Sequence, residues 1–135
     1  MSLDIQQKDR EGVAVLEMKG RITVGKEATA LREKVAELSA SNNKNIVFNL
    51  AGVDYIDSTG LGALVMTATT MRKAGGNVKL VHLNKRNIEL LVMTKLATSF
   101  EIFTDETDAV GSYYPDRKVK EFDILDFVNK MKSED

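Results

Sequence analysis

Apolar residues recur along this chain with two periods, one typical of strands and one typical of helices. Ala14, Leu16 and Met18 share one face of a run whose other face becomes polar, which predicts a strand with one buried side. Farther along, leucine, valine and methionine return at steps of three and four, the spacing of one helical face. Together these patterns predict strands at 13–19, 46–50, 78–83 and 102–103, helices at 25–39, 59–74, 87–96 and 121–131, and a turn or helix from Asp105 to about Val110.

The most regular of these helices, 59–74, indicates the class of fold. It places Leu64 and Ala68 on its inward face, and Gly75 follows it where a left-handed cap is favoured. Strands that alternate with helices of this length need crossover connections, which go with parallel pairing. The sequence therefore predicts an α/β fold with a mainly parallel or mixed sheet.

The C-terminal part has a different character from the rest of the chain. Residues 112–120 contain Pro115, the single proline, and are predicted to link the domain at 1–111 to a last segment. Residues 121–131 carry apolar side chains at helical spacing and predict an amphipathic helix. This helix is expected to dock on its own domain, on a second copy of the chain in a homodimer, or on another partner. Its apolar positions are Ile124, Phe127, Val128 and Met131.

Composition removes several classes of protein. At 135 residues, with 43% hydrophobic and 29% charged residues, the chain is expected to form one soluble globular domain. A net charge of −1 gives no general attraction to nucleic acid or to an anionic membrane. The absence of cysteine excludes disulfides and thiolate metal sites. Residues 1–12 lack the apolar core of a signal peptide, and no run approaches a membrane span, so we expect a cytoplasmic location.

The stretch "DYIDSTGLGAL" at 54–64 holds the best candidate for chemistry, but the residues around it do not favour an enzyme. In a hydrolase, Ser58 would lie in a G-x-S-x-G turn beside a histidine base, whereas Ile56 occupies the first glycine position. The single histidine, His82, falls in the middle of a predicted apolar strand. Asp54 and Asp57 are three residues apart on a predicted loop, where turn and capping roles are commoner than paired acid–base catalysis.

Cofactor sites are equally unsupported. The glycines match neither the G-x-G-x-x-G pattern nor a P-loop, so no nucleotide site is predicted. With one histidine and scattered acids, the sequence predicts no metal site, and no cofactor is expected. A simpler interpretation is a helix N-terminus, at which Asp57 or Ser58 accepts hydrogen bonds from free backbone N–H groups. The Ser58 hydroxyl should then project at the exposed start of the helix, where an added phosphate is tolerated.

The run "NIVFNLAGVDYIDSTGLGALV", preceded by "LEMKGRIT" and followed by "AGGNVKLVHLN" and "IELLVMTKLATSFEIF", resembles the STAS domain family. It is most similar to the stand-alone bacterial anti-sigma factor antagonists. The likeness extends from about Leu3 to Gly111, and the D-S-[ST]-G-[LI]-G core is a specific signature. The resemblance implies a four-to-five-stranded mixed sheet with helices packed mainly on one face, to which this chain adds a C-terminal helix.

The resemblance also implies a function. Such antagonists bind an anti-sigma factor that is also a serine kinase, phosphorylation of the motif serine breaks the complex, and a serine phosphatase resets it. Carried over, Ser58 is the phosphoacceptor, Asp57 is the neighbouring acid, and 60–62 form a closely packed start of the helix. Thr23 stands where relatives commonly have an acidic residue on the partner surface. The implied partner-binding residues are Thr23, Asp57, Ser58, Thr59, Gly60, Leu61 and Gly62.

Two other functions remain open at this point. One is a constitutive STAS scaffold or subunit, in a signalling or lipid-transport assembly, that has no phosphorylation cycle. The other is a domain that binds a nucleotide or another small ligand, which the missing phosphate-binding motif disfavours. An intact serine beside an acid favours the switched antagonist, which is a binding protein and not an enzyme.

Overall fold

The computed structural model describes residues 3–134, and these residues build one five-stranded mixed sheet. Strand β1 pairs antiparallel with β2, whereas β2, β3, β4 and β5 run parallel, in the spatial order β1-β2-β3-β4-β5. The predicted α/β fold with a mixed sheet is confirmed. The strands are β1 (Leu3–Arg10), β2 (Val13–Ile22), β3 (Asn45–Ile56), β4 (Asn77–Val81) and β5 (Glu101–Phe103).

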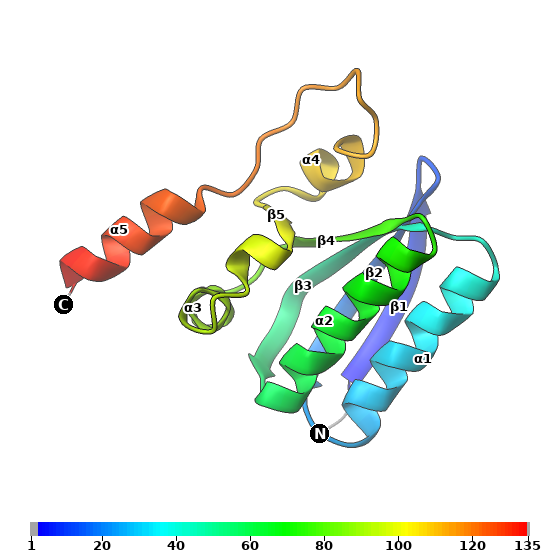
Figure 1. Ribbon diagram of the computed structural model, residues 1–135, viewed down its shortest axis with the longest axis horizontal. Helices are drawn as coiled ribbons and strands as arrows, with labels where there is room; N and C mark the ends of the chain where they lie inside the picture. Colours follow the sequence, from blue (N-terminus) through cyan, green and yellow to red (C-terminus); the bar gives the residue numbers. More distant parts are fainter. Residues whose placement is uncertain (1–2, 135) are drawn as a thin grey trace.

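Helices cover the two faces of this sheet unequally, as Figure 1 shows for α1 and α2, which lie side by side across it. α1 (Lys26–Ala40), α2 (Ser58–Lys73) and α3 (Lys85–Met93) pack on one face and supply the three parallel crossovers. The short α4 (Glu106–Gly111) packs on the other face. A 3-10 turn (Ala97–Ser99) precedes β5, and α5 (Ile124–Glu134) ends the described chain. Packing mainly on one face is therefore also confirmed.

Alternation along the strands explains the two layers of the core. Leu16, Phe48 and Leu80 point toward α1 and α2, and their neighbours Val15 and Val47 point toward α4. The predicted inward face of α2 is correct, because Leu64 and Ala68 are 0% and 2% exposed. The start of α2 is thereby held rigidly against the sheet.

Three features of the strands differ from the predictions. β1 was not predicted, because its mostly exposed residues include only two strongly apolar ones on the inward side, Leu3 and Ile5. β3 continues beyond Leu50 to Ile56, so Asp54 lies in a strand and not on a loop. β4 ends at Val81, which leaves His82 exposed with φ 61°; the prediction of His82 inside a strand was wrong.

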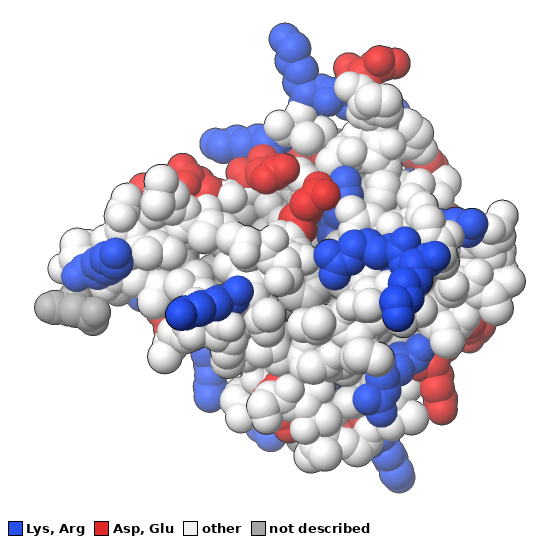
Figure 2. Space-filling model, in the orientation of Figure 1, with Lys and Arg blue, Asp and Glu red and all other residues white. Residues whose placement is uncertain are grey.

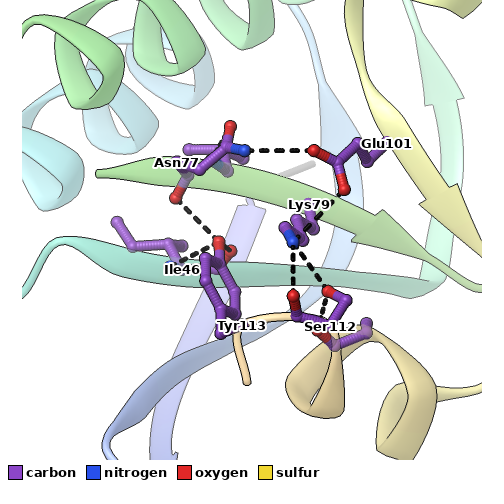
Figure 3. Close-up of polar contacts among 8 residues, drawn as sticks. Ile46, Asn77, Lys79, Glu101, Ser112 and Tyr113 are labelled. Atoms are coloured by element: carbon purple, nitrogen blue, oxygen red, sulfur yellow. Dashed lines mark hydrogen bonds and ion pairs between the residues drawn. The ribbon is translucent and has the colours of Figure 1, made fainter. Parts of the chain in front are cut away.

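The segment expected to be a linker packs against the sheet (Figure 3). The Tyr113 hydroxyl lies 2.6 Å from the Ile46 carbonyl oxygen and 2.9 Å from that of Asn77, and it accepts a hydrogen bond from the Ile46 N–H at 3.1 Å. Burial raises the pKa of Tyr113 well above its usual value. Lys79, only 5% exposed, donates to the Ser112 hydroxyl at 2.7 Å and pairs with Glu101 at 3.2 Å. These contacts fasten residues 112–113 to the ends of β3, β4 and β5.

The C-terminal helix begins at Ile124 and stands away from the sheet on the side of β5 and α3 (Figure 1). It is attached through Phe122, whose N–H donates to the Ile102 carbonyl at 2.7 Å and whose side chain packs against the main core with Ile124. The rings of Phe122 and Phe127 lie 5.9 Å apart. Leu125 of the same helix is 72% exposed. The helix thus contacts the domain along its first turn.

Backbone exchange should report on this attachment. We expect slow amide exchange at Phe122 and intermediate protection across 124–131, because the apolar side of α5 is only partly covered. Phe122→Ala should accelerate exchange across 121–131 and leave β4 unchanged. Protection that grows with protein concentration would indicate that a second copy of the chain binds α5. Rapid exchange at every concentration would contradict docking of α5 both on its own domain and on a second copy.

Candidate functional site

Ser58 lies at the carboxyl edge of the sheet, where β3 ends at Ile56 and α2 begins at Ser58 itself. Asp57 is the residue that caps the helix, since its backbone is extended and its Oδ1 accepts a hydrogen bond from the Gly60 N–H at 2.7 Å. Of the two caps considered from the sequence, Asp57 is therefore the one observed. Ser58 occupies the first helical position, is exposed, and its hydroxyl makes no hydrogen bond within residues 3–134.

The second carboxylate oxygen of Asp57 links the start of α2 to the loop between β2 and α1. It accepts a hydrogen bond from the Val24 N–H at 3.0 Å, and the Asp57 N–H donates to the Ile22 carbonyl at 3.2 Å. This brings Thr23, half-buried in the β2–α1 loop, to the same edge as the serine. Hydrogen bonds from the N–H groups of Gly60, then Val24 and Thr59, hold the pKa of Asp57 below its usual value.

The two motif glycines have different roles. A Cβ on Gly60 would lie 1.8 Å from the Ile22 carbonyl oxygen, so only glycine allows α2 to approach β2 this closely. A Cβ on Gly62 would have nothing within 4 Å. The close approach predicted for 60–62 is thus correct at Gly60 and wrong at Gly62. Gly60 and Leu61 are buried, whereas Thr59 and Gly62 are exposed beside Ser58.

An open pocket of about 340 Å³ lies between the starts of α2 and α3, with Ser58 in its wall. Arg86, Leu90 and Met93 of α3 form the opposite side. Asn84 fixes the start of α3, because its side chain caps the helix by accepting a hydrogen bond from the Asn87 N–H at 2.8 Å. The Asn87 side chain, almost fully buried, donates to the Val53 carbonyl at 3.1 Å.

Sequence reasoning missed the part that α3 plays in the site. The available signal was the pair of asparagines three residues apart directly after a predicted strand, because Asn at such a position favours a helix cap.

Other kinds of site are not apparent in the part of the chain that the structure describes. Within 3–134, no three histidine, aspartate or glutamate side chains come together as a metal ion would need. No helix among these residues combines the length and apolar character that crossing a membrane requires. His82 does not line the Ser58 pocket. Figure 2 shows acidic and basic side chains both scattered over the face it presents, with broad uncharged areas between them.

Residues 4–109 match the family profile of the STAS domain. The chain belongs to the STAS domain family. Its relatives include an anti-sigma-B factor antagonist of Bacillus subtilis, 35% identical over 102 residues, which are 76% of this chain and 92% of that protein. An anti-sigma-F factor antagonist, RsfB, of Mycobacterium tuberculosis is 32% identical over 114 residues, 81% of this chain and 88% of its own.

Solved structures of anti-sigma factor antagonists share the fold of this chain. An anti-sigma factor antagonist from Mycobacterium paratuberculosis aligns with a TM-score of 0.70 at 22% identity, over 82% of this chain and 92% of that one. The antagonist SpoIIAA in its unphosphorylated form aligns with a TM-score of 0.64 at 15% identity, over 83% and 99%. The Bacillus SpoIIAA in its phosphorylated form gives 0.64 at 14%, over 82% and 99%.

The two motif glycines of this STAS domain should respond oppositely to alanine. Gly60→Ala forces α2 away from the Ile22 carbonyl, so we expect a loss of about 1–3 kcal/mol in the free energy of unfolding. Gly62→Ala meets no neighbour and improves helix propensity, so we expect a gain of up to about 1 kcal/mol. Urea unfolding of both variants measures the contrast. Equal changes at the two positions would contradict the close packing at Gly60.

The helix cap formed by Asp57 should also make the folding stability of the domain depend on pH. Because the folded state lowers the pKa of Asp57, its charge stabilises the STAS domain above the unfolded pKa of about 3.9. That contribution disappears as the pH falls through the lower, folded pKa. Melting curves of the wild type and of Asp57→Asn should therefore differ at neutral pH and converge in acid. A difference that persists unchanged at the acid end would contradict this role of the charge.

Proposed function

We propose that this protein is an anti-sigma factor antagonist that binds a kinase-type anti-sigma factor while Ser58 is unmodified and is released when Ser58 is phosphorylated. It would thereby regulate transcription in the cytoplasm without catalysing a reaction itself. The observation that carries this proposal is the exposed, unpartnered hydroxyl of Ser58 at the first position of a capped helix. A kinase could reach this hydroxyl without unfolding any part of the domain.

Two further observations support the proposal. Both curated relatives are named as antagonists of anti-sigma factors, and they match this chain over most of their length. SpoIIAA, which has the same fold, has been described in both an unphosphorylated and a phosphorylated form. The positive end of α2 offsets part of an added negative charge, so the fold should survive the modification.

The partner surface that we propose surrounds Ser58. Thr23, Thr59 and Gly62 are accessible around the serine, and the partner would contact them directly. A second group of residues would position Ser58 without contacting the partner, because the helix cap and the close packing fix the direction in which Ser58 projects. These residues are Asp57, Gly60 and Leu61. Apolar contact area is available on both sides of the serine. It is supplied by Val24, 66% exposed, and Met93, 75% exposed.

Incubation with labelled ATP tests this function. We expect no incorporation with ATP alone, incorporation after addition of a serine-kinase anti-sigma factor from the same genome, and removal by a serine phosphatase. Ser58→Ala should abolish labelling, and the matched control Thr70→Ala, at an exposed position farther along α2, should retain it. Self-phosphorylation would indicate an enzyme. Stable binding of an unmodified partner without any phosphorylation would favour the scaffold.

A further inference from the structure

Two arginines at the edge that carries Ser58 have no carboxylate partner among residues 3–134. Arg86, the second residue of α3, lies with its guanidinium carbon 4.8 Å from the centre of the Tyr55 ring. Arg21 of β2 pairs in register with Tyr55. A hollow of about 300 Å³ is lined by Arg21, Asp54, Tyr55 and Arg86, and it adjoins the Ser58 pocket because Tyr55 and Arg86 line both.

The two carboxylates that line the Ser58 pocket already have partners. Both carboxylate oxygens of Asp57 already accept backbone N–H groups, and Glu89 is 4.0 Å from the ammonium group of Lys85. Arg86 is the cation that lines the pocket together with Ser58, and its guanidinium lies over the face of the Tyr55 ring. Stacking of this kind leaves the N–H groups of the guanidinium edge free to donate.

Phosphorylation would add about −1.5 to −2 charges at Ser58 in neutral solution. Arginine binds phosphate with two parallel hydrogen bonds, which is stronger than a contact to a neutral acceptor. We propose that Arg86 pairs with the phosphoryl group of phosphorylated Ser58, turning from the Tyr55 ring into the pocket that both residues line. This inference rests on the proposed modification of Ser58 and adds how the modified state is held within the chain itself. Tyr55 is uncovered as a result, so the pairing alters the surface beside the serine as well as its charge.

The test needs neither the kinase nor the anti-sigma factor, because phosphoserine can be incorporated genetically at position 58. Phosphorus NMR then gives the second pKa of the phosphate, which is about 6 without neighbours. A nearby guanidinium favours the dianion, so this pKa should be at least about half a unit lower in the wild type than in Arg86→Gln. Arg86→Lys should fall between the two. Arg32→Gln is the matched control, since Arg32 is an exposed arginine on α1 that lines a different hollow.

Two results would overturn the pairing. One is the same phosphate pKa in the wild type and in Arg86→Gln. The other is a shift caused by Arg21→Gln but not by Arg86→Gln, which would assign the phosphate to the other arginine. Melting curves of the unphosphorylated variants exclude a general loss of structure. Partner binding that does not change when Ser58 is phosphorylated would contradict the proposed function but would leave this titration unaffected. Failure of the proposed function and failure of the Arg86 pairing are therefore distinguishable.

Discussion

Ser58→Asp should bind the kinase-type anti-sigma factor about a hundredfold to a thousandfold more weakly than the wild type, although it should fold normally. The aspartate places a fixed charge and added volume at an exposed position that the partner surface would otherwise close around. Removing this added charge from water at such a contact costs several kcal/mol, and each 1.4 kcal/mol is tenfold in Kd. Protein phosphorylated at Ser58 should bind at least as weakly. Ser58→Ala should bind like the unmodified wild type and accept no phosphate.

Calorimetry on the wild type, the two variants and the phosphorylated protein measures these affinities. Thr70→Asp supplies a matched control, because it adds the same charge to an exposed position of α2 about 18 Å along the helix from Ser58. Its affinity should equal that of the wild type. Equal affinities of all five proteins would leave Ser58 as an ordinary surface residue at a helix start.

The position of Ser58 could be predicted from the sequence because its determinants are local. The apolar period of α2 is uninterrupted, and an aspartate and a serine stand just ahead of its first apolar residue. Both the helix and its exposed start therefore follow from residues within one segment. Which of the two residues caps the helix could not be decided in this way. That choice depends on the Val24 N–H, which β2 and the following loop bring to Asp57 from 33 positions away.

Other parts of the fold depend on partners distant in sequence, and these were not predicted. β1 carries little apolar signal of its own and forms by antiparallel pairing with β2. The end of β3 was missed because Gly52 interrupts its apolar pattern, although parallel pairing with β2 continues to Ile56. Residues 112–120 read as a linker from their composition. The place of Tyr113 follows instead from three backbone groups on Ile46 and Asn77, which come together only in the folded sheet.

The rigidity of the site depends on the core beneath α2, and Leu64→Asp should therefore unfold the domain. Leu64 is 0% exposed and lies in the main core cluster, surrounded by apolar side chains of α1 and the sheet. An unpaired carboxylate there costs several kcal/mol, which is comparable to the total stability of about 5–15 kcal/mol expected of a domain. Met66→Asp is the matched control, because Met66 lies two residues along the same helix and is 55% exposed. Thermal melting followed by circular dichroism should show no cooperative transition for Leu64→Asp and a near wild-type transition for Met66→Asp. A wild-type melting temperature for Leu64→Asp would mean that α2 is not held against the sheet through this face.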